Sequence, residues 1–383
     1  MQKYEKCKYA AGGSVKTKIK KLLSFCFYLF ILFRKPKRPV GDPSKNTIAV
    51  IMLASIGDLI VFCDAAKKIT ANGKEIILIC KKGNGTADFA KKAGLFDRIV
   101  EINFNGFHRL FGIKALRRIE ADTVFCAPLG RHALSDTCVC AVRAKHRILP
   151  DTLLDCSLPI IKRIFDKRAD ELIPISEVSE IKRYTEFFNA CGLIFEKVKV
   201  FKSDCSDTHR NRTLAIFPGA GGGNGKCWQT EKFSFTAKGI IKKGFISKVL
   251  ILGNNSDTDR CDTLYSLLCK CCDTVNLCGK TTISELADIL TECCLTLTND
   301  SGGAHLSIAC DTPTIIICGM WQPGRFYPNS ELSRSHSAVF AGECFLQTCD
   351  SSYPLCLNKT APCIDAVNPN TVLKHAEEIL RLS

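Results

Sequence analysis

The sequence contains no apolar run of the roughly 20 residues that a helix needs to span a bilayer. Its 12-residue run Leu22–Phe33 would measure about 18 Å as a helix, against a hydrocarbon core of about 30 Å. Basic residues stand on both sides of this run and no small-residue cleavage site follows, which argues against a cleavable signal peptide. The sequence therefore predicts a chain that works in the cytoplasm.

The sequence also lacks the cysteine pattern of a disulfide scaffold, although it has 24 cysteines. They are scattered through apparent core segments such as "TECCLTL" and "LLCKCCDTV", where a thiol serves as a small hydrophobe. Four of the 24 lie within 20 residues of the tail, with spacings x4, x6 and x6 and no C-x2-C pair. These are candidate ligands for zinc or an iron–sulfur cluster, or else packing residues: Cys344, Cys349, Cys356 and Cys363.

Charge of one sign dominates the chain, which has 53 basic and 38 acidic residues and a net charge of +15. Such an excess favours anionic partners. Part of it flanks the apolar run, in residues 16–38, "KTKIKKLLSFCFYLFILFRKPKR". This segment predicts a helix lying on an anionic inner-membrane surface; docking on the protein's own surface is the alternative. A nucleic-acid-binding role is disfavoured, because the basic residues are not interleaved with stacking aromatic residues.

The 383 residues are too many for one typical domain and suit two. After a linker, strand-like and helix-like segments alternate, which is typical of α/β domains with parallel sheets. The first series of expected strands covers 47–54, 75–80, 98–102, 122–127 and 146–150, with a helix over 58–71 and another near 177–191. The second series covers strands 213–217, 248–252, 274–277, 293–297 and 312–318, with helices 231–243, 257–270 and 282–291 and a terminal helix 369–381.

The glycine-rich turn in "TLAIFPGAGGGNGKCW" follows the first strand of the second series. Glycines let backbone N–H groups approach an anion, so this turn and Lys226 predict phosphate binding. It is not a P-loop, because Ala220 stands where glycine is required and Cys227 where a Ser or Thr binds magnesium. A flexible turn with a solvated lysine is the alternative interpretation.

Two further turns carry candidate functional residues. Asp58 follows the first strand in "LASIGDLIVF" and is either the N-cap of a helix or a general base. In "TNDSGGAHLSIACDTPTIIICG" a strand ends and an apolar helix begins. Asp300 or Ser301 would cap this helix, the glycines from Gly302 on would bare its N–H groups, and His305 would share a face with Ser301. This set predicts a diphosphate at the helix N-terminus.

These segments resemble glycosyltransferase family 9, the bacterial heptosyltransferases. The resemblance rests on "IMLASIGDLIV", "FPGAGGGNGKCW", "LILGNNSD" and "TNDSGGAHLSIACDTPTIIICG", which occur in family order over residues 47–330. It implies a GT-B fold, with two doubly wound Rossmann-like domains facing across a cleft. The expected divisions are a membrane-associating extension and linker (1–46), an acceptor-binding domain (47–205), a nucleotide-sugar-binding domain (206–343), and a Cys-rich segment with a terminal helix (344–383).

The resemblance further implies inverting sugar transfer that requires no metal or other cofactor. A nucleotide-sugar, with ADP-heptose as the candidate, would donate to a lipid-linked glycan such as lipopolysaccharide core at the inner membrane. Asp58 would be the general base. The donor would be held by Gly219, Ala220, Lys226, Asp257, Asp300, Ser301, Gly302 and His305. Asp257 is the residue that can replace an acid the family often carries near Asn254. The alternative is a binding protein that kept the fold and lost the chemistry.

Overall fold

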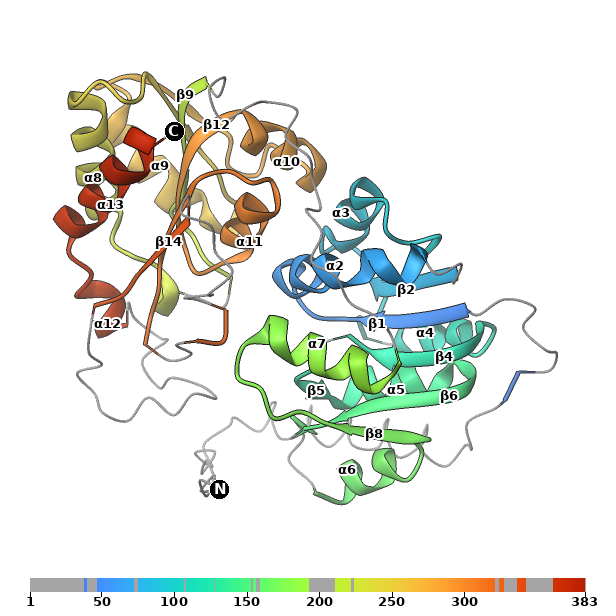
Figure 1. The fold of residues 1–383 in the computed structure, drawn as a ribbon. Coiled ribbons are helices and arrows are strands. Elements are labelled where there is room, and N and C mark those ends of the chain that lie inside the picture. The colour runs from blue at the N-terminus through green and yellow to red at the C-terminus, as the bar shows by residue number, and fades with distance from the viewer. Residues whose placement is uncertain are drawn as a thin grey trace, which may run out of the picture.

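The structure is a computed structural model. It describes residues 38–39, 47–71, 75–106, 108–127, 129–152, 154–155, 159–192, 211–221, 224–320, 324–326, 336–341 and 361–382. Two six-stranded parallel sheets dominate it, and each forms the centre of one domain (Figure 1). The predicted α/β class is therefore confirmed.

The first sheet has the order β3-β2-β1-β4-β6-β8. Its strands are β1 (Thr47–Met52), β2 (Glu75–Lys81), β3 (Arg98–Ile102), β4 (Glu120–Cys126), β6 (Arg143–Asp151) and β8 (Glu171–Pro174). A small parallel pair, β5 (Arg131–His132) and β7 (Leu154–Asp155), lies outside it. The chain starts at the centre of the sheet, builds to one edge and then returns to the other side of β1. The turns after β1 and β4 therefore flank a topological switch point, which is where such sheets bind ligands.

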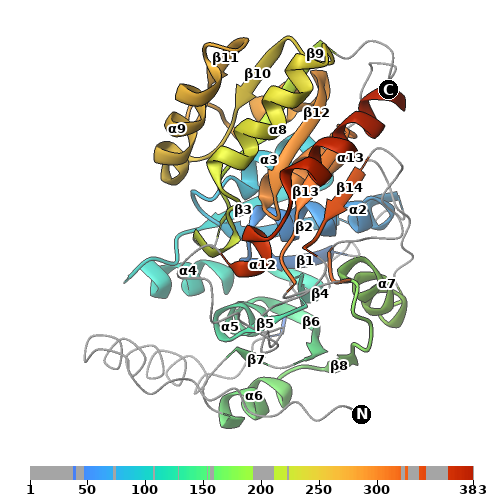
Figure 2. The same ribbon diagram turned by 90° about the vertical axis from the view of Figure 1, so that its left-hand side faces the viewer.

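Helices cover both faces of this sheet, because successive side chains of its buried strands point to opposite faces. One face carries α2 (Ile56–Ala71), α3 (Thr86–Ala93) and α7 (Glu180–Ala190). The opposite face carries α4 (His108–Leu116), α5 (Ala133–Ala141) and α6 (Pro159–Asp166). Figure 2 shows the two sets of helices on the two sides of the sheet.

The second sheet repeats the design with the order β11-β10-β9-β12-β13-β14. Its strands are β9 (Asn211–Phe217), β10 (Lys248–Ile251), β11 (Asp273–Asn276), β12 (Cys293–Asn299), β13 (Thr314–Ile317) and β14 (His336–Val339). Its switch point lies between β9 and β12. The outer face is covered by α8 (Thr230–Lys242), α9 (Thr258–Leu268) and the terminal helix α13 (Pro369–Leu382), and the short α12 (Pro362–Asp365) packs into the same core.

The inner face of the second sheet meets the first domain. It carries α10 (Ile283–Glu292) and α11 (Gly302–Ala309), and one cluster of buried apolar residues continues from these helices into α2 and α3. Polar contacts flank this junction: Lys92 Nζ lies 2.6 Å from Asp288 Oδ1, and Arg325 Nε lies 2.9 Å from Glu180 Oε2. The predicted pair of doubly wound domains is confirmed in this closed arrangement.

Several predictions about segments lie outside the described residues. Residues 16–37 are among them, as are the expected domain divisions at 205/206 and 343/344 and three of the tail cysteines. The basic Arg38 is described, and its Nη2 lies 2.7 Å from Oδ1 of Asp170, the residue before β8. Within the described ranges, no helix is long and apolar enough to cross a membrane.

Candidate functional site

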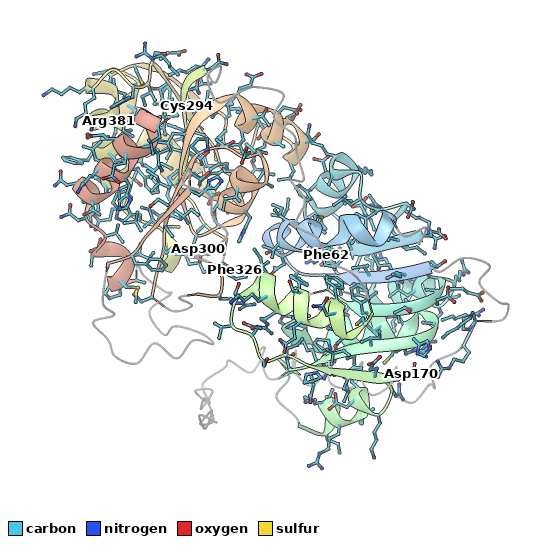
Figure 3. All side chains as sticks on the ribbon, in the orientation of Figure 1. Phe62, Asp170, Cys294, Asp300, Phe326 and Arg381 are labelled. Atoms are coloured by element: carbon cyan, nitrogen blue, oxygen red, sulfur yellow. The ribbon has the colours of Figure 1, made fainter. Side chains whose placement is uncertain are left out.

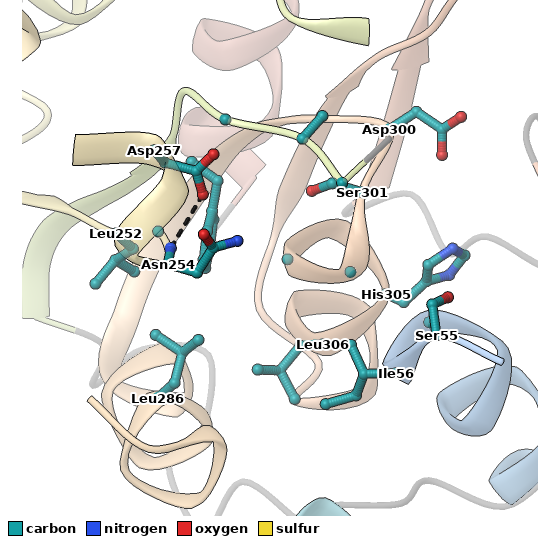
Figure 4. A pocket seen from close by; sticks show the side chains of 18 of the residues that line it. Ser55, Ile56, Leu252, Asn254, Asp257, Leu286, Asp300, Ser301, His305 and Leu306 are labelled. Carbon is teal, nitrogen blue, oxygen red and sulfur yellow. Dashed lines mark hydrogen bonds between the residues drawn. The ribbon is translucent and has the colours of Figure 1, made fainter. Parts of the chain in front are cut away.

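A cavity of about 780 Å³ lies between the two domains, and loops from both sheets line it. Nine sequence-predicted site residues line this cavity: Asp58, Gly219, Ala220, Lys226, Asp257, Asp300, Ser301, Gly302 and His305. The loops that carry them follow β1 in the first domain and β9, β10 and β12 in the second (Figure 4). Because the carboxyl ends of these parallel strands point toward the junction, residues far apart in sequence meet there.

The N-terminus of α11 forms one wall of the cavity. Ser301 occupies the N-cap position, but its side chain makes no capping hydrogen bond, and Asp300 lies one residue before the cap. The side-chain cap expected of Asp300 or Ser301 is therefore wrong. Ser301 Oγ instead lies 3.5 Å from Thr298 Oγ1. The first N–H groups of α11 are thus not capped by a side chain, which suits an anion at this positive end of the helix.

The two glycines of α11 are also required by close packing. A Cβ on Gly302 would lie 2.9 Å from Ile56 Cγ2 of the first domain. A Cβ on Gly303 would lie 2.8 Å from the ring of Phe217. Both distances are shorter than real side-chain contacts allow. The glycines therefore let α11 approach α2 and β9, in addition to leaving the helix N-terminus uncovered.

His305 points from α11 toward the turn that begins α2 (Figure 4). Its ring lies against Gly57, where a Cβ would be 2.8 Å from Cδ2, and packs edge-on against Phe326 with 5.3 Å between ring centroids. Burial lowers the pKa of His305 below its usual value of 6.5, and Lys226 adds to that lowering, whereas Asp300 and Asp58 oppose it. The imidazole is therefore neutral at pH 7, and four predicted site residues act on one another here.

Lys226 and Asp300 come from adjacent strands at the switch point of the second sheet. Lys226 ends a short 3-10 turn, η2 (Asn224–Lys226), and its Nζ lies 3.9 Å from Asp300 Oδ2. Both side chains are partly exposed to the cavity. Figure 3 places Asp300 and Phe326 together at the junction of the domains. A long, partly solvated ion pair leaves the ammonium group able to meet an anion that enters the cavity.

Asp58 lies in the first turn of α2, on the first-domain side of the cavity. Its Oδ2 accepts hydrogen bonds from Ser55 N at 3.1 Å and Ser55 Oγ at 2.7 Å. The carboxylate therefore accepts a hydrogen bond from the backbone N–H that precedes the helix, which is one of the two hydrogen bonds of a capping box. Its Oδ1 makes no hydrogen bond to a described residue. The expected N-cap role of Asp58 is therefore wrong, because Asp58 is the third residue of α2 and its side chain bonds back to Ser55. Its role as general base stays a prediction.

Asp257 stands at the opposite end of the cavity, in the 3-10 turn η3 (Asn255–Asp257). Its Oδ2 accepts a hydrogen bond from Asn254 N at 3.0 Å (Figure 4). A Cβ on Gly219 would lie 2.1 Å from Asp257 Oδ1. The carboxylate therefore covers the backbone of the glycine-rich turn, and Gly219 is needed for that contact.

Asn299 is a site-building residue that the sequence did not single out. Its side chain is fully buried, accepts a hydrogen bond from Trp228 N at 2.9 Å, and donates to the carbonyl oxygens of Pro218 at 2.9 Å and Gly219 at 3.3 Å. One amide thus joins the end of β12 to both ends of the glycine-rich loop. Its sequence signal was an asparagine closing an otherwise buried strand, directly before Asp300.

The tail cysteines are described only at Cys363, which is buried in α12. Its Sγ lies 3.5 Å from Met320 N. Among the residues that the structure describes, no three His, Cys, Asp or Glu side chains are grouped to hold a metal ion. The proposal of a tail metal site therefore stays a prediction.

Comparison with known proteins agrees with this geometry. Residues 194–351 match the sequence model of glycosyltransferase family 9 (heptosyltransferase). Lipooligosaccharide heptosyltransferase 2 of Campylobacter jejuni is 30% identical over 179 residues, 45% of this chain and 52% of that protein. Lipopolysaccharide heptosyltransferase 2 of Salmonella typhimurium is 27% identical over 139 residues, 34% of this chain and 38% of that protein. The chain spans about half the length of the curated relatives it matches.

Solved structures match over most of the chain. A glycosyltransferase family 9 protein from Veillonella parvula has a TM-score of 0.67 at 15% identity and covers 88% of this chain and 98% of its own. The Escherichia coli heptosyltransferase WaaC with ADP-2-deoxy-2-fluoro heptose has a TM-score of 0.60 at 15% identity and covers 87% of this chain and 99% of its own. The fold is therefore GT-B, and residues 194–351 are similar in sequence to glycosyltransferase family 9.

Proposed function

We propose that this protein is an inverting glycosyltransferase that moves a sugar from a nucleotide-diphosphate donor to a lipid-linked glycan. The observation that carries the proposal is the cavity in which Asp58 of one domain faces Lys226, His305 and the uncovered N-terminus of α11 in the other. A base and an anion site on opposite walls are what a direct displacement at a sugar carbon needs.

In this reaction Asp58 removes the proton from the acceptor hydroxyl. The hydroxyl oxygen forms a bond to the anomeric carbon while the bond from that carbon to the diphosphate oxygen breaks. The hydrogen bonds from Ser55 hold Asp58 Oδ2 in place, so Oδ1 is the atom that takes the proton. Charge that builds on the departing diphosphate is stabilised by Lys226 and by the first N–H groups of α11.

The other predicted residues position these groups. Asp300 lies 3.9 Å from Lys226 and orients the ammonium group toward the diphosphate. His305 stays neutral and places a hydrogen-bonding imidazole beside it without adding a second positive charge. Gly219, Ala220 and Asp257 form the turn that faces the nucleotide end of the donor. The reaction as drawn uses no metal ion.

The donor class follows from the same site together with the relatives. The matching family model and the relatives are named for heptose transfer, and the WaaC structure holds an ADP-heptose analogue. ADP-heptose is therefore our candidate donor, and lipopolysaccharide core our candidate acceptor. Such an acceptor places the enzyme in the cytoplasm, at the inner face of the cytoplasmic membrane.

Substitution of Asp58 tests the proposal. We expect Asp58→Asn to lower kcat for acceptor-dependent release of nucleotide diphosphate by about 10²–10⁴-fold, because the amide cannot take the proton. Calorimetric binding of ADP should be unchanged, since Asp58 lies on the acceptor side. Ser55→Ala, which removes only one support of the carboxylate, should lose much less activity. Wild-type turnover by Asp58→Asn would refute the assignment of the base.

A non-catalytic sugar-nucleotide-binding protein is the second candidate. It is favoured by Asp257, the residue that can replace the acid often found near this position in the family. Oδ2 of Asp257 already accepts a hydrogen bond from Asn254 N. Donor binding without acceptor-dependent nucleotide release, across a panel of lipid-linked acceptors, would support this candidate over the enzyme.

A further inference from the structure

Two helices on one face of the first domain expose large apolar side chains. The exposed fractions are 45% for Leu110 and 69% for Phe111 on α4, and 59% for Ile160 on α6. Both helices cover the sheet face opposite α2, with the buried α5 packed between them. Large exposed apolar side chains on neighbouring helices of one domain face are candidates for an interaction surface.

Basic residues accompany these apolar side chains at matching intervals. Lys114 and Arg118 follow Phe111 by three and seven residues, and Arg163 and Lys167 follow Ile160 by the same intervals. All four are exposed, and none makes an ion pair with a described residue. Residues 102–119 contain no Asp or Glu. We name these seven residues the α4–α6 face: Leu110, Phe111, Lys114, Arg118, Ile160, Arg163 and Lys167.

The topology orients this face relative to the cavity. α4 follows β3, and α6 follows β6 and the short β7, so each helix starts at the carboxyl edge of the sheet and runs back along the strands. The apolar residues lie in the first turns of both helices, nearest that edge. The basic residues lie toward the helix ends and just beyond them. The face therefore has apolar residues nearest the carboxyl edge of the sheet and basic residues further from it.

We infer that the α4–α6 face binds the surface of an anionic lipid bilayer. Phe, Leu and Ile side chains enter the boundary between headgroups and acyl chains, and Lys and Arg contact anionic headgroups. No aromatic residue alternates with the basic ones to stack on bases, which disfavours nucleic acid. Docking here would bring the carboxyl edge of the first sheet, which also carries Asp58, toward the membrane that holds a lipid-linked substrate. The inference concerns the folded domain and is independent of residues 16–37.

Vesicle co-sedimentation of the full chain tests the inference. The test variant Phe111→Ser/Lys114→Gln/Arg118→Gln is compared with wild type on vesicles of phosphatidylethanolamine and phosphatidylglycerol, and on phosphatidylcholine alone. Near an anionic membrane surface, the loss of one basic residue weakens binding roughly fivefold. We therefore expect partition into the anionic vesicles to fall at least about tenfold, with little binding of either protein to phosphatidylcholine. The equivalent α6 variant, Ile160→Ser/Arg163→Gln/Lys167→Gln, should also lose binding.

Helix α8 supplies a matched control. Phe235, Lys238 and Lys242 repeat the spacing of Phe111, Lys114 and Arg118, and Phe235 is 48% exposed. On α8, however, Glu231 stands one turn before Phe235, and Glu377 of α13 pairs with Lys243. The variant Phe235→Ser/Lys238→Gln/Lys242→Gln should therefore bind vesicles as wild type does. It makes the same changes in charge and apolar surface.

Three results would overturn the inference. One is equal vesicle binding by the α4, α6 and α8 variants. Another is a dimer of the wild-type chain, seen by sedimentation, that the α4 and α6 substitutions dissociate without changing vesicle binding. The third is binding to duplex DNA that these substitutions abolish while vesicle binding persists. Thermal unfolding and ADP binding of each variant verify the fold, and neither sugar transfer nor its absence affects the outcome.

Discussion

The imidazole of His305 in the second domain lies directly against the backbone of Gly57 in the first, where a Cβ would be only 2.8 Å from Cδ2. This contact joins the helix that we assign to the diphosphate to the helix that carries the proposed base, because Asp58 is the next residue. The spacing between the two halves of the site therefore depends on a residue without a side chain.

Gly57→Ala should damage both stability and activity. The added methyl group has to displace His305 or push α2 from α11, and overpacking of this kind costs about 1–3 kcal/mol. We expect a lower Tm and a lower kcat for sugar transfer. Gly130→Ala is the control, because no atom lies within 4 Å of its Cβ position and its backbone is not left-handed. Unchanged Tm and kcat in Gly57→Ala would show that the contact is not tight.

Asn299→Asp should weaken donor binding while changing the shape of the side chain very little. A carboxylate cannot donate the hydrogen bonds that Asn299 gives to Pro218 O and Gly219 O. Leaving buried polar groups unsatisfied costs about 1–3 kcal/mol. We expect a lower free energy of unfolding in urea and weaker ADP binding by calorimetry. Asn189→Asp, at an exposed position on α7, should change neither.

The buried environment of His305 predicts a dependence of stability on pH. Its pKa is lowered in the folded protein, so between the folded value and the usual value of 6.5 the unfolded chain binds more protons. Stability from this group is complete above pH 6.5 and falls as the pH drops below it. The Tm advantage of wild type over His305→Gln should therefore shrink from about pH 7 to about pH 5. A pH-independent difference would contradict the shift, and His146→Gln, at an exposed position on β6, serves as reference.

Lys226→Gln should weaken nucleotide-diphosphate binding more than nucleoside binding. The ammonium group faces the cavity, and a hydrogen bond to a charged partner contributes about 1.5–3 kcal/mol, or about 10–100-fold in affinity. Calorimetry with ADP and with adenosine measures the difference. Lys226→Arg should retain much of the affinity, and Lys238→Gln on α8 should retain all of it. Equal losses for ADP and adenosine would indicate a damaged pocket instead of a lost phosphate contact.

The sequence predicted most of the secondary structure because the signals involved are local. Apolar runs such as Thr47–Met52 mark strands buried on both sides, and a glycine or a polar cluster marks each turn that follows. The resemblance in residues 298–319 added the expectation of a shared donor site. The structure brings those residues together with Lys226 in one cavity, while their chemical roles stay predictions until tested.

Contacts between segments far apart in the chain were not accessible from local patterns. Ser301 was expected to cap α11 by its type and position, but in the structure its hydroxyl lies beside Thr298. Asn299 looked like a strand end, because nothing near it in sequence reveals the Pro218 and Gly219 carbonyls that lie 80 residues or more away.

The first five strands of each sheet, the two α/β series and the candidate residues follow from the sequence, since periodicity and turn chemistry act over a few residues. The edge strands β8 and β14 were not predicted. Tertiary structure decided why Gly57, Gly302 and Gly303 are glycines. Packing of α11 against α2 and β9 leaves no volume for a Cβ, and such a limit arises only when segments between 86 and 248 residues apart share the same space.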